Sequence, residues 1–233
     1  LRGAAAFVLA LLCIVLIALA QRAGWLAPLD HGVMLAAGRA RDSAAGGQMT
    51  SVLRLATVIG DTVPRLCLLA TAIVVLVARG RGRAALWLGA MMAGGTLLNL
   101  GLKQVFAAPR PDLLPHLDAV TTYSFPSGHA AGNMMFFGAL ALLAGRRIGF
   151  VLAGVAIALI GISRVWLGVH WPSDVAAGWV EGLGWIAFCA VWLPARGRQQ
   201  QGAPDAAMGR HAVAGDEAVE PETVDDGRGG DQR

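Results

Sequence analysis

Three short fragments between residues 103 and 174 hold the side chains that could carry out a reaction. They read Lys103-x6-Arg110-Pro111, Pro126-Ser127-Gly128-His129 and Ser163-Arg164-x5-His170-x3-Asp174. Cationic side chains bind an oxyanion, and a histidine can either attack it or give it a proton. Phosphoryl transfer needs mainly positioning and charge stabilisation, which three cations could supply in place of a metal ion. The chemistry therefore depends on whether the chain brings the three fragments together.

Each fragment also has an ordinary explanation when it is considered alone. The proline-led fragment is typical of a capped helix start, where free backbone N–H groups can bind an anion. Lys103 and Arg110 could reach lipid head groups from the end of a membrane span. The third fragment could be a polar interfacial loop, although Asp174 lies four residues after His170 and could fix the tautomer of its ring.

The composition indicates a membrane protein made of helices. Of the 233 residues, 56% are hydrophobic and the mean hydropathy is +0.59, with several apolar runs near the length that crosses a bilayer. These runs do not alternate polar and apolar residues as the strands of a membrane barrel do. We therefore expect an all-α fold, an integral membrane bundle of about six transmembrane helices.

The apolar runs and turn residues give approximate helix positions. The expected spans cover about 4–20, 63–78, 84–102, 127–144, 148–163 and 174–193, with an interfacial helix around 25–41. They form one predicted transmembrane domain over residues 1–195. The segment 196–233 is rich in Gly, Asp, Glu and Gln, and we expect a disordered polar tail on the cytoplasmic side.

The short basic connections predict the orientation in the membrane. Two of them carry only basic charges, at Arg79, Arg81 and Arg83 and at Arg146 and Arg147. In a six-span bundle both lie on the side of the two chain ends, which the positive-inside rule makes cytoplasmic. Four arginines in the long connection after the first span argue the other way, but short connections decide orientation more strongly. All three fragments would then meet at the non-cytoplasmic face.

Charge and cysteines narrow the partners and cofactors. The net charge of +4 arises from a basic excess in the membrane part, which favours anionic lipid head groups over nucleic acid. Cys13, Cys67 and Cys189 each lie inside an apolar run with no metal-ligand spacing, so we expect them to pack. An acid within a span is costly, so Glu181 is either functional or paired with a polar group.

All three fragments are intact signatures of one family. The chain resembles the type 2 phosphatidic acid phosphatase (PAP2) family, whose motifs are KxxxxxxRP, PSGH and SRxxxxxHxxxD and which shares its site with vanadium haloperoxidases. The resemblance is to the membrane lipid phosphatases of that superfamily, and it covers about residues 50–194.

The resemblance implies a role for each signature residue. His170 looks like the nucleophile that forms a phosphohistidine, and Asp174 resembles the group that orients it. His129 looks like the general acid for the leaving group and then the base for water. The residues that would bind the substrate phosphate are Lys103, Arg110, Ser127, Gly128 and Arg164. No metal or other cofactor is implied.

The expected function is metal-independent hydrolysis of a lipid phosphomonoester or diphosphate. Candidate substrates are undecaprenyl diphosphate, phosphatidylglycerol phosphate, phosphatidic acid and lipid A phosphate, with a preference for the first type. The expected location is a bacterial inner (plasma) membrane, with the site facing outward and both termini cytoplasmic. Two alternatives stay open: a phosphotransferase with a non-water acceptor, which would release no free phosphate, and a non-catalytic lipid-binding or transport protein.

Overall fold

The chain folds into helices throughout the part that is described. The structure is a computed structural model that describes residues 1–194, and their regular secondary structure is entirely helical. The helices are α1 (Arg2–Arg22), α2 (Ala27–Arg41), α3 (Gly46–Gly60), α4 (Thr62–Ala78), α5 (Gly82–Phe106), α6 (Gly128–Ala144), α7 (Arg147–Trp166), α8 (Pro172–Cys189) and the short 3-10 helix η1 (Ala190–Trp192). The predicted all-α class is confirmed, whereas the predicted polar tail over 196–233 lies outside the described residues.

The number of spans is close to the expected six but depends on two short helices. α1, α5, α7 and α8 are each long and apolar enough to cross a membrane, and α3 and α4 meet at 53° as a possible broken fifth span. α4 and α6 have 17 residues each, about 26 Å of helix, which is less than the roughly 30 Å of a bilayer core. Every predicted span corresponds to a helix, but six is an approximate count of full crossings.

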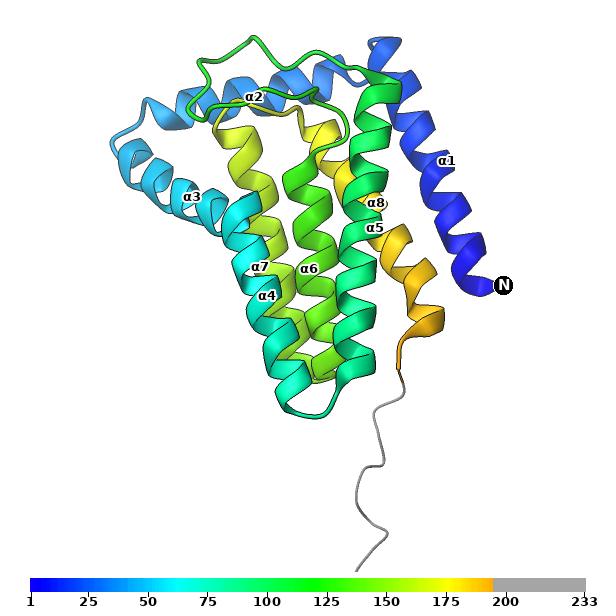
Figure 1. The fold of residues 1–233 in the computed structure, drawn as a ribbon. Helices are drawn as coiled ribbons and strands as arrows, with labels where there is room; N and C mark the ends of the chain where they lie inside the picture. Colours follow the sequence, from blue (N-terminus) through cyan, green and yellow to red (C-terminus); the bar gives the residue numbers. More distant parts are fainter. Residues whose placement is uncertain (195–233) are drawn as a thin grey trace, which may run out of the picture. The chain divides into compact units, whose positions relative to one another are not determined.

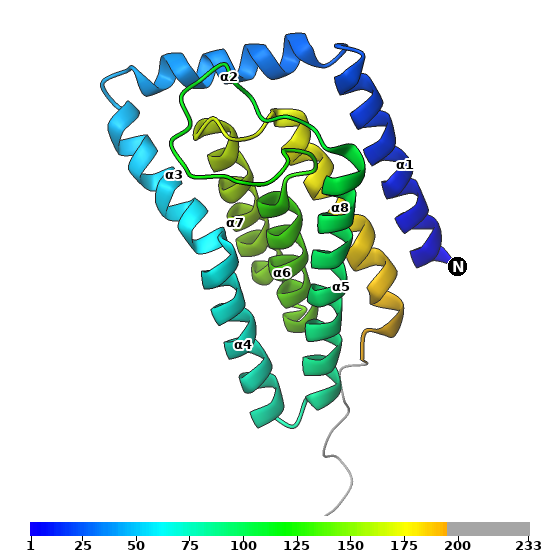
Figure 2. The ribbon, with the colours of Figure 1, turned by 45° about the horizontal axis from the view of Figure 1, so that its top comes forward.

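α6 lies in the middle of the bundle and packs against α5, α7 and α8 (Figures 1 and 2). Its contact with α8 is close because α8 presents glycines there. A Cβ atom on Gly178 would lie 2.6 Å from the carbonyl oxygen of Ser127, and one on Gly182 would lie 2.6 Å from Cβ of Met134. Small residues let two membrane helices approach until their backbones touch. This approach brings the start of α6 beside the start of α8.

One end of the bundle is covered by α2 and by the loop of residues 107–127 (Figure 2). α2 runs across the ends of the spans, where an interfacial helix was predicted, and its buried Met34 packs with Val165 of α7 and Val175 of α8. The loop is held by backbone hydrogen bonds, including one of 2.9 Å from Leu117 N–H to the Leu167 carbonyl. All three sequence fragments lie at this covered end.

The glycine contact between α8 and α6 generates a stability prediction. We expect Gly182→Ala to lower the unfolding midpoint in detergent, because the added methyl group would overpack the contact with Met134 at a cost of about 1–3 kcal/mol. Gly154→Ala on α7 is the matched control, since nothing lies within 4 Å of its added carbon. Alanine also favours a helix over glycine by about 1 kcal/mol, so the control should be neutral or stabilising. Equal midpoints for the two variants would contradict the close packing.

Candidate active site

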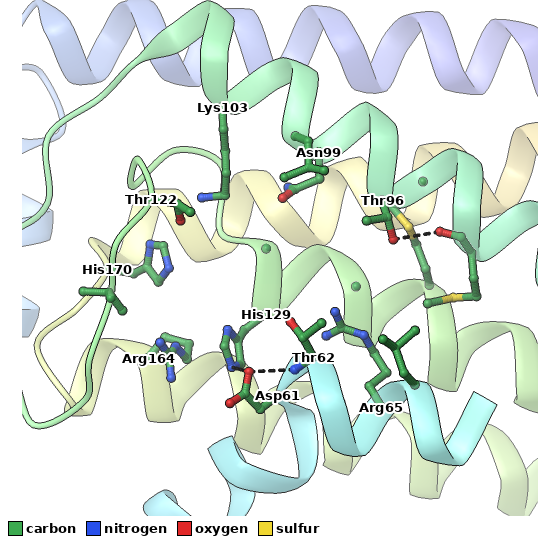
Figure 3. A pocket seen from close by; sticks show the side chains of 18 of the residues that line it. Asp61, Thr62, Arg65, Thr96, Asn99, Lys103, Thr122, His129, Arg164 and His170 are labelled. Atoms are coloured by element: carbon green, nitrogen blue, oxygen red, sulfur yellow. Dashed lines mark hydrogen bonds and ion pairs between the residues drawn. The ribbon is translucent and has the colours of Figure 1, made fainter. Parts of the chain in front are cut away.

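A pocket of about 780 Å³ opens beneath the loop of residues 107–127, among α4, α5 and α6 (Figure 3). Six of the eight predicted site residues line it: Lys103, Arg110, Gly128, His129, Arg164 and His170. The other two, Ser127 and Asp174, are fully buried behind it. The three fragments, which are separated in the sequence, therefore meet at one place.

His170 and Asp174 form a buried pair at the start of α8. His170 Nδ1 lies 3.2 Å from Asp174 Oδ2, and the two side chains are 2% and 0% exposed. Pro172 begins α8 between them, so the chain turns and the carboxylate in the first helical turn reaches back to the ring. Because of this turn, His170 and Asp174, four residues apart in the sequence, are within hydrogen-bond distance.

The hydrogen bonds around His170 fix its tautomer. Ser124 Oγ gives its proton to Asp174 Oδ2 at 2.5 Å, so at 3.2 Å from His170 Nδ1 it can only accept. His170 Nδ1 therefore carries a proton and donates to oxygen atoms on this side. His170 Nε2 is left with its lone pair, and it lies 3.3 Å from Nη1 of Arg110, which has only protons to donate. A neutral ring with an unprotonated Nε2 is the form that can attack phosphorus.

Burial keeps the ring neutral. It lowers the pKa of His170 from its ordinary 6.5 to about 4, although the hydrogen bond that the ring donates to Asp174 acts in the opposite direction. The nearby positive charges of Arg110 and Lys103 lower this pKa further. At neutral pH the nucleophilic form needs no further deprotonation.

Arg110 and Lys103 are held at the pocket by backbone carbonyl groups. Arg110 donates to the carbonyl oxygens of Thr122 at 2.8 Å and Val169 at 2.7 Å. Lys103, near the end of α5, donates to the carbonyl oxygen of Tyr123 at 2.5 Å. None of these three carbonyl partners carries a full charge, so both cations keep their charge available to an anion.

Arg164 is paired with an acid that the sequence analysis did not single out. Its Nη1 donates to Asp118 Oδ2 and to Thr57 Oγ1, both at 2.6 Å, while its buried Nε has no hydrogen-bond partner among residues 1–194. Asp118 belongs to the loop that covers the pocket and is 34% exposed. A carboxylate thus occupies a donor of Arg164 that a phosphate could otherwise use.

His129 projects into the pocket from the first turn of α6. Its Nε2 lies 3.6 Å from Asp61 Oδ1, beyond hydrogen-bond distance, and this buried atom has no hydrogen-bond partner within the described chain. Asp61 stands at the bend between α3 and α4 and accepts a hydrogen bond of 2.6 Å from the N–H of Thr62. A buried ring nitrogen without a partner is expected where a substrate atom binds.

Ser127 is buried away from the pocket, whereas Gly128 lines it. Ser127 is the N-cap of α6, where its Oγ accepts from Ala130 N–H at 3.4 Å and its own N–H donates to the Asp174 carbonyl at 3.0 Å. Because Ser127 is fully buried and absent from the pocket lining, its position supports joining α6 to α8 more than touching phosphate. Gly128 lines the pocket, and a Cβ atom there would come within 3.0 Å of Asn99 Oδ1.

Three polar residues inside the spans make hydrogen bonds to neighbouring helices, and for Glu181 such a polar partner was one of the two predicted alternatives. Asn99 Nδ2 donates to Glu181 Oε2 at 2.8 Å between α5 and α8. Asn133 of α6 donates at 2.7 Å to the carbonyl of Gly60, where α3 ends. These bonds link neighbouring helices and place Asn99 on the pocket lining.

Several residues at the site carried no recognisable signal in the sequence. They are Gln21, Asp61, Arg65, Asp118, Thr122 and Ser124. They belong to α1, α4, the α3–α4 bend and the loop of residues 107–127, where no fixed spacing connects them to the three fragments. The one signal that the sequence offered for them was a charged or hydrogen-bonding side chain in a largely apolar chain.

Comparison with known proteins identifies the family of the chain. Residues 84–198, which include all three fragments, match the model of the PAP2 superfamily. The chain belongs to the PAP2 superfamily. A solved transmembrane PAP2 type phosphatidylglycerolphosphate phosphatase from Bacillus subtilis is similar in fold, with a TM-score of 0.64, 26% identity, and coverage of 79% of this chain and 93% of that one.

Curated PAP2 relatives match over shorter regions. The chain is 42% identical over 78 residues to the undecaprenyl-diphosphatase of Sulfolobus acidocaldarius, which is 33% of this chain and 36% of that protein. It is 38% identical over 96 residues to phosphatidylglycerophosphatase B of Bacillus subtilis, which is 37% of this chain and 47% of that protein. The match therefore spans less than half the length of these two relatives.

The depressed pKa of His170 leads to a spectroscopic prediction. Because the folded-state pKa of about 4 lies below the ordinary 6.5, the ring binds a proton only in acid, and we expect it to stay neutral from pH 8 down to about pH 5. NMR of ¹⁵N-histidine-labelled protein in detergent should show one ring protonated at Nδ1 throughout, and His170→Ala should remove that signal. A signal lost in His170→Ala that titrates near 6.5 would contradict the neutral ring.

The ion pair between Arg164 and Asp118 leads to a prediction about inhibition. We expect Asp118→Asn to lower the Ki of inorganic phosphate or orthovanadate by about 3- to 10-fold, because the competing negative charge is removed from Arg164. Asp112→Asn, an exposed acid in the same loop, is the control and should leave Ki unchanged. A higher Ki in Asp118→Asn would mean that Asp118 orients Arg164 instead of competing for it.

Proposed function

We propose that this PAP2 protein is an integral membrane phosphatase that hydrolyses a lipid phosphomonoester or diphosphate through a phosphohistidine. One observation carries the proposal: a neutral His170 with an unprotonated Nε2 faces a pocket that also holds a second histidine and the cations of the three motifs, Lys103, Arg110 and Arg164. Nucleophile, charge stabilisation and proton donor are the three functions that phosphoryl transfer requires.

In the first step His170 Nε2 attacks the terminal phosphorus of the substrate. A phosphorus–nitrogen bond forms, and the bond from phosphorus to the lipid-side oxygen breaks. The negative charge of the bound phosphate favours the imidazolium form of His129. This imidazolium gives one ring proton to the leaving oxygen and becomes a neutral ring, so the lipid product leaves neutral at this atom. Asp174 holds the Nδ1 proton and balances the positive charge that develops on the His170 ring.

In the second step water cleaves the phosphohistidine. His129, now without its proton, takes one from the attacking water molecule, and the phosphorus–nitrogen bond breaks. Inorganic phosphate leaves, and both histidines return to their starting protonation states. The same ring thus serves first as acid and then as base.

The phosphoryl oxygens would be bound by Lys103, Arg110 and Arg164. All three line the pocket, and Arg110 is within hydrogen-bond distance of the attacking nitrogen. Gly128 leaves room for an oxygen atom beside the start of α6, where backbone N–H groups favour anions. With three cations around the transferring group, we expect no metal ion to be required.

A lipid substrate is supported by the apolar part of the pocket. Leu66 of α4 and Leu97 and Leu100 of α5 line it and are also exposed on the outside of the bundle. A hydrocarbon chain could therefore pass between α4 and α5 into the membrane while its phosphate reaches the cations. The names of the relatives, an undecaprenyl-diphosphatase and a phosphatidylglycerophosphatase, add support for a lipid phosphate.

The orientation that we propose puts the pocket on the outer, periplasmic or extracellular, face of a plasma membrane. The basic residues of the connections opposite the pocket, Arg79, Arg81, Arg83, Arg146 and Arg147, support a cytoplasmic location for that end and hence for the termini. We favour undecaprenyl diphosphate or a related lipid as substrate, because such head groups are exposed on that face.

Phosphate release by purified protein in detergent tests the proposal. With EDTA present, we expect release from at least one of undecaprenyl diphosphate, phosphatidylglycerol phosphate, phosphatidic acid and lipid A. His170→Ala should reduce the rate by at least about 10³-fold, because the nucleophile is lost. His31→Ala on α2 is the matched control and should retain activity, since His31 is exposed and absent from the pocket lining.

Two results would count against hydrolysis. Equal rates for the wild type and His170→Ala would exclude the phosphohistidine. Phosphate that appears only on an added lipid or sugar acceptor, and never free in solution, would favour a phosphotransferase.

A further inference from the structure

Arg65 is a fourth cationic side chain on the lining of the pocket, and it lies outside the three family motifs. It stands in the first turn of α4, just past the bend at Gly60 and Asp61, and it lines the same pocket as His129 (Figure 3). Its guanidinium contacts α6 at Gly132, about one helical turn after His129.

The position of Arg65 is fixed by two backbone segments. Its Nη1 donates to the carbonyl oxygen of Gly60 at 2.9 Å, at the end of α3. Its guanidinium rests on α6 at Gly132, where a Cβ atom would come within 2.8 Å of Arg65 Cζ. Gly132 and His129 are three residues apart, so they share one face of α6. The absence of a side chain at Gly132 therefore lets the guanidinium sit beside the second histidine.

Most N–H donors of the Arg65 guanidinium have no hydrogen-bond partner within residues 1–194. The bond to Gly60 is the one hydrogen bond that its side chain makes within residues 1–194, and no carboxylate in that range comes within ion-pair distance. A guanidinium has five N–H donors in a planar fork that matches phosphate oxygens. Arg164 differs, because Asp118 already neutralises it. An unpaired guanidinium in a partly apolar pocket is most stable when an anion binds it.

The proposed reaction determines which part of the substrate would reach Arg65. His170 attacks from one side of the transferring phosphoryl group, and His129 protonates the oxygen that leaves on the other side. Figure 3 shows His129 between Arg164 and Arg65, with His170 on the side of Arg164. The atoms beyond the leaving oxygen therefore extend toward Arg65.

The apolar lining points in the same direction. Leu66 and Leu69 follow Arg65 on α4 and, like Arg65, line the pocket. The part of a lipid between its terminal phosphate and its hydrocarbon chain would consequently pass the guanidinium.

We propose that Arg65 binds a second phosphate, on the lipid side of the bond that is cleaved, and so selects lipid diphosphates over lipid monophosphates. This inference rests on the proposed function of the same pocket. The terminal phosphate is transferred to His170, the bridging oxygen takes the proton of His129, and the lipid monophosphate that is released keeps its charge on Arg65. A phosphodiester placed a few atoms further along a glycerol would share this chemistry, so the test includes it.

The kinetic test compares substrates that differ by one phosphate. For the wild type, Arg65→Lys and Arg65→Gln, kcat/KM is measured with farnesyl diphosphate, farnesyl monophosphate and phosphatidylglycerol phosphate. We expect Arg65→Gln to lower the diphosphate-to-monophosphate ratio of kcat/KM by about 10- to 100-fold, the effect of one charge-assisted contact, with a smaller loss in Arg65→Lys. A parallel loss with phosphatidylglycerol phosphate would extend the contact to a phosphodiester. Arg39→Gln, an exposed arginine on α2 outside the pocket, should leave the ratio unchanged.

Gly132→Ala provides a second variant that keeps the arginine. The added carbon would displace the guanidinium from α6, so the diphosphate preference should fall as it does in Arg65→Gln. An unchanged ratio in both variants would overturn the proposal. Equal losses for diphosphate and monophosphate would also overturn it, since Arg65 would then only support α4 and His129.

A binding measurement separates this proposal from the proposed function. In His170→Ala protein, the affinities of a farnesyl methylenediphosphonate and a farnesyl monophosphonate are compared with and without Arg65→Gln. We expect Arg65→Gln to weaken the diphosphonate about 10-fold or more relative to the monophosphonate. Absence of phosphate release in the wild type would overturn the hydrolase, whereas an affinity ratio that does not respond to Arg65→Gln would overturn the role of Arg65.

Discussion

The fully buried carboxylate of Asp174 is the constraint on which the rest of the site depends. A carboxylate removed from water is stable only when its oxygens receive hydrogen bonds. Its donors are Gln21 at 2.9 Å, Ser124 at 2.5 Å, the N–H of Trp171 at 3.0 Å and the ring of His170 at 3.2 Å. They come from α1, from the loop of residues 107–127 and from the start of α8. The hydrogen bonds to this one carboxylate therefore hold His170, the loop of residues 107–127 and α1 in place relative to one another.

The surroundings of this carboxylate extend the same restraint to the membrane interface. Ser173 receives a hydrogen bond from Gln21 and donates from both its N–H and its hydroxyl to Asp30, which is 3% exposed on α2. The carbonyl of Asp174 accepts from Ser127 N–H, so the beginning of α6 is attached to the beginning of α8. His129 then follows two residues after this attachment. A backbone hydrogen bond therefore links the segments that carry the two histidines.

The bend between α3 and α4 gives the pocket its second side. The two helices meet at 53°, and Asp61, Thr62 and Arg65, which follow the bend, line the pocket. Asp61 reaches His129 and Arg65 reaches Gly132 from this one turn of chain. The same helix then continues with leucines that reach the outer surface of the bundle. A charged end and an apolar route are therefore combined in one cavity, as a substrate with a phosphate head and a hydrocarbon tail would need.

The sequence by itself determined the class of fold, the position of each main helix and the residues that could act on a phosphate. Apolar runs of span length admit only helices, and the three motifs carry cations, histidines and an acid at fixed spacings. The sequence did not reveal Ser124, Gln21, Asp118 or Arg65, because their contacts join segments with no fixed separation along the chain. Nor did it show that Ser127 is buried as a helix cap instead of lining the pocket. Those outcomes were decided by the tertiary structure, since hydrogen bonding and packing act between atoms that are close in space, whatever their distance in sequence.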